Sequence, residues 1–165
     1  MATLPFDPIA RAGELWEEHF GESTAMRLAT SVMRVQQLMI ATLDGALKPF
    51  GLTFARYEVL VLLRFSRSGQ LPLSKIGERL MVHPTSVTNL IDRLEAQGMV
   101  ARTPDAHDRR RTLASLTTEG ERVVDQATAA LTALDFAVQG LDRDRQEQTY
   151  QLLRDLRAEA GDFPA

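Results

Sequence analysis

The sequence predicts a mainly α-helical fold with one small β-hairpin, and three observations support this expectation. Apolar residues recur at intervals of three and four over several long stretches, as they do along one face of an α-helix. Proline and glycine residues interrupt these stretches at the places where helices are expected to end. Two short apolar runs that flank a charged turn break the helical spacing once. The predicted order is three helices, a short strand, two helices, two strands and two helices.

The first three helices are expected in the N-terminal part of the chain. A leader, residues 1–8, contains two prolines and precedes an amphipathic helix over Ile9–His19. A second, long helix is predicted over residues 24–48, and its two apolar rows predict burial on two sides, one of them against another subunit. The third helix is predicted over Phe54–Ser66, with Thr53 as its N-cap.

Residues 73–117 predict two helices joined by a tight turn, followed by a hairpin. Ser74 is the expected N-cap of the first helix, Pro84 fits the first turn of the second, and Gly98 fits a left-handed C-terminal cap. Short hydrogen-bonding side chains and one arginine on the outer face of the second helix are the residue types that contact base edges in a major groove. The outward set is Thr85, Ser86, Thr88, Asn89 and Arg93, and the inward set is Val87, Leu90, Ile91 and Leu94.

The hairpin is predicted to pair Met99–Arg102 with Thr112–Thr117 across a charged turn. This turn contains three consecutive arginines, Arg109, Arg110 and Arg111. Arg110 is the expected minor-groove contact, oriented by an ion pair with Asp108, and its two neighbours are expected to contact phosphates. A solvated charged turn without DNA contact is the alternative. Two helices, a tight turn and such a hairpin together form a winged helix-turn-helix.

Two more helices are expected after the hairpin. The first, capped by Thr117, is predicted over Thr118–Val138, and Asp142 is the expected cap of the last. The inward set of the last helix is Thr149, Leu152, Leu153 and Leu156. The expected protomer is single and compact. In it, a leader and helix (1–22) and dimerisation helices (23–50 and 118–165) accompany a winged helix-turn-helix DNA-binding module (51–117).

The charge distribution agrees with this organisation. The chain has a net charge of −3, yet residues 71–120 carry seven Lys and Arg against six acidic residues. The remainder carries twelve basic residues against sixteen acidic ones. Distant acidic groups are screened within about 10 Å at moderate salt. The basic hairpin is therefore suited to phosphate contact.

Composition argues against several other classes of protein. The chain has no cysteine, which excludes disulfides, thiolate catalysis and zinc–thiolate sites. No nucleophile–base set, glycine-rich phosphate loop or paired-histidine pattern is found, so no enzyme activity, cofactor or metal is expected. No run approaches the roughly 18–20 apolar residues of a membrane span, and no signal pattern precedes the first helix. A cytoplasmic protein with no membrane partner is expected.

The run from Leu52 to Gly120 resembles the MarR family of winged helix-turn-helix regulators. The matching pieces are LTFARYEVLVLL, the helix TSVTNLIDRLEAQGMV, the hairpin sequence DRR and the exit SLTTEG. The resemblance implies a homodimer on a pseudo-palindromic operator in double-stranded DNA. Each subunit would place the second helix of its helix-turn-helix in a major groove and its wing at the neighbouring minor groove.

A closer resemblance is to the PecS branch of this family, many members of which respond to urate. It is carried by FDPIA and a following tryptophan and histidine, and by MRVQQ, LKPFGLTFARYE and VHPTSVTN. In that branch a tryptophan, an acidic residue and arginines form the ligand site. The matching positions here are Trp16, Glu58 and Arg102, and Leu90 stands where one further arginine is expected.

This resemblance implies a repressor that is released from DNA by a small anionic or aromatic ligand such as urate. An aromatic face at Trp16 and a guanidinium at Arg102 suit such a molecule. In the free protein Glu58 and Arg102 can pair, and an anionic ligand that competes for Arg102 would shift the second helix of the helix-turn-helix. Trp16 in a hydrophobic core or a dimer interface is the alternative. The alternative functions are a ligand-independent MarR-type regulator and a helical protein-interaction module without DNA readout.

Overall fold

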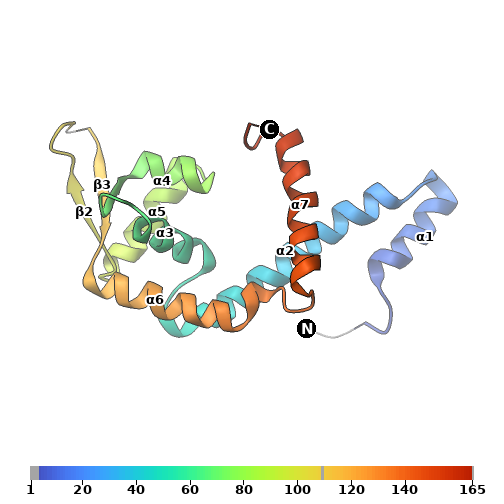
Figure 1. Ribbon diagram of the computed structural model, residues 1–165. Coiled ribbons are helices and arrows are strands. Elements are labelled where there is room, and N and C mark those ends of the chain that lie inside the picture. Colours follow the sequence, from blue (N-terminus) through green and yellow to red (C-terminus); the bar gives the residue numbers. More distant parts are fainter. Residues whose placement is uncertain (1–3, 109, 165) are drawn as a thin grey trace. The chain divides into compact units, whose positions relative to one another are not determined.

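The computed structural model describes residues 4–108 and 110–164, and it has the element order predicted from the sequence (Figure 1). The protein is mainly α-helical with a small antiparallel sheet, as expected. Packing divides the chain into an N-terminal unit, residues 1–42, and a winged-helix unit, residues 43–165. The division lies inside one long helix, whereas the boundaries predicted from the sequence lie after residues 22, 50 and 117.

The N-terminal unit is a helical hairpin made of α1 (Pro8–Phe20) and most of α2 (Thr24–Leu47). The two helices approach closely at Gly13, where an added Cβ would lie 2.6 Å from Cδ of Arg27. The fully buried hydroxyl of Ser23 donates a hydrogen bond to Glu17 at 2.5 Å. These small and polar contacts, rather than apolar packing, hold the hairpin together.

Many large apolar residues of the N-terminal unit are exposed, so the side of the long helix that was expected to be buried within the protomer is not buried, and the side expected against another subunit remains a prediction. Burial of α2 on two sides was predicted, yet within the protomer only Leu43 and Leu47 of this helix are buried, and both belong to the winged-helix unit. The rows along the rest of α2 have no apolar cover from the described part of the chain. The exposed large apolar residues of the unit include Leu15, Trp16, Phe20, Leu28, Val32, Met33, Val35, Leu38 and Ile40.

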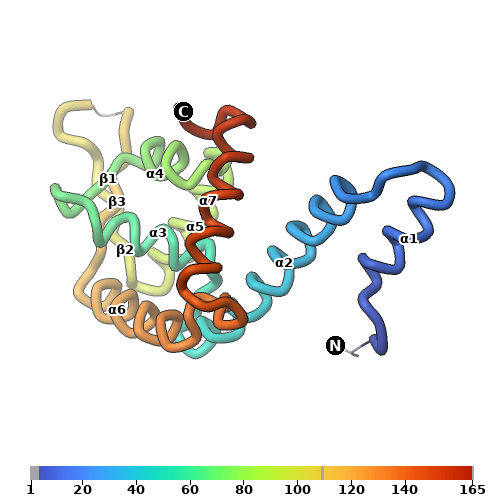
Figure 2. The backbone as a smooth tube through the Cα atoms, turned by 45° about the vertical axis from the view of Figure 1, so that its right-hand side comes forward, coloured from blue at the N-terminus to red at the C-terminus, as the bar shows by residue number. Residues whose placement is uncertain are grey.

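The winged-helix unit continues from the last turn of α2 to the end of the chain. Its elements are η1 (Lys48–Phe50), α3 (Phe54–Arg64), β1 (Gln70–Pro72), α4 (Leu73–Leu80), α5 (Pro84–Ala96), β2 (Val100–Pro104), β3 (Thr112–Leu116), α6 (Thr118–Ala133), η2 (Asp135–Ala137) and α7 (Arg143–Glu159). The antiparallel sheet has the order β1-β3-β2, and the β2–β3 hairpin projects from one end of this unit (Figures 1 and 2).

A single apolar core joins α3, α4, α5 and α6 to the sheet. Its fully buried large side chains come from every one of these helices and from the last turn of α2, so the core fixes the helix-turn-helix against the hairpin. They include Leu47, Leu60, Leu63, Ile76, Ile91, Leu94 and Leu131. Leu90, expected in the inward set, is only half-buried.

Two predicted helix caps differ from those observed. Helix α4 begins at Leu73 with Pro72 at its N-cap, so Ser74 lies inside the helix and does not cap it. The strand β1 ends at Pro72 and leads directly into α4, which starts the helix earlier than expected. Thr53 occupies the N-cap position of α3 but makes no side-chain cap. The carboxylate of Asp44 in α2 instead accepts a hydrogen bond from the backbone N–H of Phe54 at 2.7 Å.

The C-terminal helices also depart from expectation. Helix α6 ends at Ala133, not near Val138, because residues 135–137 adopt left-handed backbone angles, with φ of 48°, 49° and 65°. Asp142 caps α7 as predicted, since its carboxylate accepts from the N–H of Arg145 at 2.9 Å. The predicted inward set of α7 is wrong for the protomer, because no residue of this helix is buried. No described helix is both long and apolar enough to span a bilayer.

Candidate nucleic-acid interface

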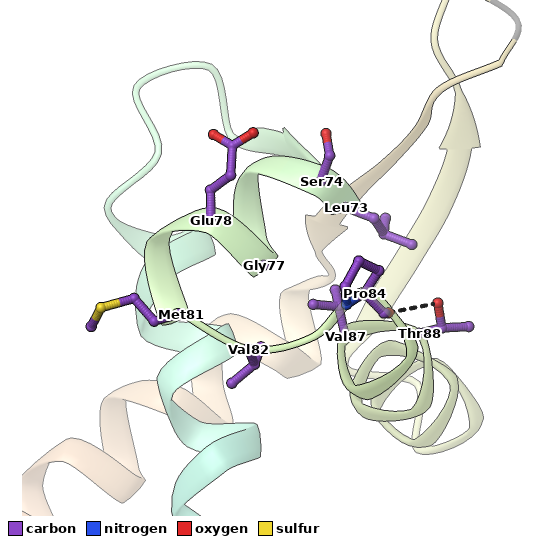
Figure 3. A pocket seen from close by; sticks show the side chains of 9 residues that line it. All are labelled: Leu73, Ser74, Gly77, Glu78, Met81, Val82, Pro84, Val87 and Thr88. Carbon is purple, nitrogen blue, oxygen red and sulfur yellow. Dashed lines mark hydrogen bonds between the residues drawn. The ribbon is translucent and has the colours of Figure 1, made fainter. Parts of the chain in front are cut away.

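The helix-turn-helix consists of α4, a short turn and α5 (Figure 3). Helix α4 ends at Leu80, and its C-cap residue Met81 has a φ of 54°, which places a non-glycine residue in the left-handed region. His83 then caps α5, since its Nδ1 accepts from the N–H of Thr85 at 3.3 Å. Close packing fixes the angle between the helices, because a Cβ at Gly77 would lie 3.1 Å from Val87. The conformation of Met81, the His83 cap and the contact at Gly77 therefore fix the orientation of α5 relative to α4.

The outer face of α5 is polar and exposed, and it contains all the residues predicted to contact base edges. Thr88 donates its hydroxyl hydrogen bond to the carbonyl oxygen of Pro84 at 3.2 Å, which Figure 3 shows as a dashed line. Among the described residues, no side-chain partner is found for Asn89 or Arg93. The exposed set is Thr85, Ser86, Thr88, Asn89 and Arg93. An amide and a guanidinium without internal partners are available to an external ligand.

The C-terminal half of α5 is bound to the hairpin through Arg102 of β2. Its guanidinium donates to Asp92 at 2.6 Å and also to Glu95. The hydrogen bond to Glu95, followed by that to Asp92, raises the pKa of Arg102. No ion pair between Arg102 and Glu58 is found in the described part of the chain, so the expected pairing is replaced by a bridge to α5.

Glu58 lies on α3, and its carboxyl group is partly desolvated although the residue as a whole is exposed. Burial raises the pKa of Glu58, and no neighbouring cation lowers it. A carboxyl group in such a position favours its neutral form more than a free glutamate does.

The junction of α5, the hairpin and α6 is closely packed. Gly98 follows α5 with a φ of 71°, which makes it the left-handed cap predicted from the sequence. The hydroxyl of Thr117 donates to the carbonyl oxygen of Gly98 at 2.7 Å. A Cβ at Gly120 would lie 2.0 Å from the carbonyl oxygen of Met99, so only glycine fits there. These contacts hold the start of the hairpin against the start of α6.

The hairpin turn is organised by Asp108. Its carboxylate accepts from the backbone N–H of Arg110 at 3.0 Å and lies 3.3 Å from Nε of the same residue, the ion pair expected from the sequence. These two hydrogen bonds, backbone first, lower the pKa of Asp108. Arg111 lies 3.7 Å from the other carboxylate oxygen. The Arg110 side chain is 92% exposed, and Arg109 lies outside the described residues.

Trp16 belongs to a different unit from the other two residues of the predicted ligand site. It lies on α1, where its ring centroid is 4.9 Å from that of Phe20 and the two rings are tilted. Phe20 is 75% exposed and Trp16 is 40% exposed. Glu58 and Arg102 belong to the winged-helix unit.

Arg56 and Gln97 were not singled out by the sequence analysis. Arg56 on α3 donates from Nη1 to the side chain of Gln97 at 3.2 Å, and Gln97 donates to the carbonyl oxygen of Gly51 at 2.8 Å. Arg56 and Gln97 are 41 positions apart along the chain, and Gln97 and Gly51 are 46 positions apart. Contacts at such separation leave no local periodicity or motif, so the sequence offered no signal for them.

Comparison with known proteins gives concordant findings. A sequence model of the MarR family matches residues 52–112. The transcriptional repressor MdtR of Bacillus subtilis is 34% identical over 117 residues, which are 66% of this chain and 74% of MdtR.

Two solved structures resemble most of the chain. Sco5413, a MarR family transcriptional regulator from Streptomyces coelicolor, is 52% identical with a TM-score of 0.79, and the match covers 86% of this chain and 98% of Sco5413. CouR from Rhodococcus jostii, solved with p-coumaroyl-CoA bound, is 29% identical with a TM-score of 0.68, over 84% of this chain and 93% of CouR.

Proposed function

The chain belongs to the MarR family of transcriptional regulators, and on that premise we propose that it acts as a homodimeric repressor at a pseudo-palindromic operator. It is a DNA-binding transcriptional regulator with a winged-helix fold and is not an enzyme. The repressor role is supported by the similarity to MdtR, itself named as a repressor.

One observation supports the DNA contact: the polar face of α5 and the side chains of Arg110 and Arg111 all belong to the winged-helix unit and are exposed. We assign base contacts in the major groove to the outer face of α5. We assign the minor groove to Arg110 and phosphate contacts to Arg109 and Arg111. Arginine suits this role because its planar guanidinium donates to several acceptors at once.

The exposed apolar residues of α2 and α7 support the homodimer. Large apolar patches on one protomer are typical of surfaces that another protein covers. Two-fold symmetry would present two copies of α5 to half-sites about one helical turn, roughly 10 bp, apart. The regions 23–50 and 118–165 are accordingly proposed as dimerisation helices beside the DNA-binding module at 51–117.

The ligand part of the proposal is release from DNA by a small anionic aromatic molecule such as urate. The similarity to CouR, solved with an aromatic acyl-CoA bound, supports a ligand of this general kind. An exposed aromatic face at Trp16 and the guanidinium of Arg102 suit such a molecule. A ligand that drew Arg102 away from Asp92 and Glu95 would weaken the bridge between α5 and the hairpin. DNA affinity would then fall, because ligand and DNA favour different arrangements.

The test is a mobility-shift titration of the purified protein on the DNA upstream of its own gene, at several salt concentrations. We expect specific binding whose logarithmic affinity falls steeply with the logarithm of salt concentration, since arginine–phosphate contacts release counterions. Binding that is absent, or insensitive to salt, would remove the DNA half of the proposal. It would favour the protein-interaction alternative.

The ligand half has a separate test. Urate and related aromatic anions are added to the preformed complex, with wild-type protein and with Trp16→Ala. We expect release of wild-type protein and a weakened response of the variant, whose DNA affinity without ligand is unchanged. If none of these anions releases the wild-type protein, the proposed ligand class is wrong while DNA binding stands.

A further inference from the structure

A surface pocket of about 540 Å³ lies between α3 and α5, outside the residues assigned so far to the wing and the ligand. Its charged and polar lining brings two arginines to one place from different helices. The lining residues are Arg56, Asn89, Leu90, Asp92 and Arg93. Two of them, Asn89 and Arg93, also belong to the outer face of α5, so the pocket opens on the same surface that faces DNA in the proposed function.

Arg56 is held in position by its own neighbours. Its Nε donates to the hydroxyl of Thr53 at 3.3 Å, and its Nη1 donates to Gln97 at 3.2 Å. Gln97 is in turn fixed to Gly51, where φ is 69° and an added Cβ would lie 2.9 Å from the Gln97 amide nitrogen. A guanidinium has five N–H donors, so several remain for a ligand. Prior ordering reduces the conformational entropy lost on binding.

The charge of the pocket is positive despite the presence of Asp92. This is the one carboxylate among the described lining residues, and its Oδ1 accepts a hydrogen bond from Arg102 at 2.6 Å. Arg102 is shared between Asp92 and Glu95, so it compensates Asp92 only in part, and the lining itself carries two arginines against one carboxylate. Arg56 has only neutral hydrogen-bond partners, and Arg93 has none among the described residues. Two guanidinium groups that form no ion pair among the described residues, beside an amide donor, fit an oxyanion.

We propose that Arg56 and Arg93, with Asn89, bind a phosphate-type oxyanion in this pocket. The inference rests on the proposed DNA-binding function for the origin of the oxyanion. A DNA backbone that lies against Asn89 and Arg93 brings its phosphates to the pocket, which extends the interface from α5 onto α3. A free anion of the same chemistry is the other source, and the experiment separates the two.

The first arm measures DNA affinity against salt concentration by fluorescence anisotropy. Arg56→Gln is expected to weaken binding several-fold for every sequence and to lower the salt slope by about 1. Arg56→Lys is expected to restore most of the slope, because an ammonium still neutralises a phosphate as a point charge. Arg64→Gln is the matched control, since Arg64 lies on the same helix but pairs with Asp125 of α6. A purely structural role of Arg56 would change the melting temperature without changing the slope.

The second arm identifies the source. Neutral methylphosphonates are placed at single backbone positions of the operator. At one position, the methylphosphonate should lower the DNA affinity of the wild-type protein but not that of Arg56→Gln. That position marks the backbone phosphate that Arg56 contacts. In parallel, inorganic phosphate is titrated into the DNA-free protein, and the amide resonances of Asn89 and Arg93 are followed by NMR.

Each outcome is decisive. A reduced salt slope with one non-additive methylphosphonate supports a DNA phosphate. An unchanged slope, with phosphate-induced shifts that Arg56→Gln abolishes, supports a free anion. If neither effect is observed, the proposed oxyanion site is wrong. If wild-type protein binds no DNA, the proposed function fails, while the phosphate titration still decides whether the pocket binds an oxyanion.

Discussion

Two regions of the molecule have the same helical spacing of apolar residues but bury them very differently. In the winged-helix core, apolar residues of α3, α5 and α6 lie at or near zero exposure. In α7, Leu152 is 68% exposed, and many apolar side chains of α2 are exposed as well. The comparison teaches that periodicity identifies an apolar face but not what covers it. The core face is covered by its own chain, and the faces of α2 and α7 are open to another.

The largest expected effect tests the buried side of this comparison. Ile91→Ala removes a fully buried side chain of α5 and should lower the free energy of unfolding by about 2–5 kcal/mol, measured by urea denaturation. Phe65→Ala, at a side chain that is 78% exposed, is the control and should change stability by less than about 0.5 kcal/mol. Equal effects of the two substitutions would contradict the contrast between core and surface.

The open side is tested in α7. Replacing Leu152 and Leu156 together by Asp should weaken self-association while the helical content of the protomer is retained. Burial of a leucine contributes about 1.5–3 kcal/mol. The pair should therefore cost roughly 3 kcal/mol or more, which is over a hundredfold in the dissociation constant. Light scattering and circular dichroism measure the two properties. A dimer that survives the substitutions would exclude this face of α7 from the interface.

A smaller effect concerns the exposed wing. Arg110→Ala should weaken operator binding by about 1–3 kcal/mol, because it removes a base or phosphate contact at the tip of the hairpin. Arg145→Ala, an exposed arginine of α7, is the charge-matched control. Anisotropy titrations at constant salt compare the two variants with wild type. Unchanged affinity for Arg110→Ala would remove the minor-groove assignment.

The smallest effect is predicted at Glu58. Because burial raises the pKa of this carboxyl above its unfolded value, ionisation of Glu58 at neutral pH costs more free energy in the native state than in the unfolded chain. Glu58→Gln should therefore raise the melting temperature slightly at pH 7. The gain should disappear below about pH 4, the unfolded range of glutamate, where wild type is protonated in both states. Glu121→Gln, at an exposed carboxylate of α6, is the control. A gain independent of pH would point to packing instead.

Much of the fold was predictable because its signals are local. Pro84 and Gly98 predicted the ends of α5, and Asp142 predicted the start of α7 from neighbouring residues alone. The cap of α3 was not predictable in this way, because Asp44 reaches Phe54 from another helix. The candidate sites differ in the same way, because some depend on local spacing and others on contacts between distant elements. The polar face of α5 follows from helical spacing, whereas the partners of Arg102 depend on how β2 packs against α5.

The end of α6 could not be anticipated either, and it has a thermodynamic consequence. Asp135, Phe136 and Ala137 are consecutive left-handed residues without a glycine among them. Each such residue costs roughly 1–2 kcal/mol relative to a right-handed turn. A local cost of several kcal/mol must be offset by contacts elsewhere, yet within the protomer Phe136 and the leucines of α7 are exposed. The order of this turn is then expected to depend on protein concentration, so that assembly of the dimer and the geometry of the chain between α6 and α7 form one coupled equilibrium.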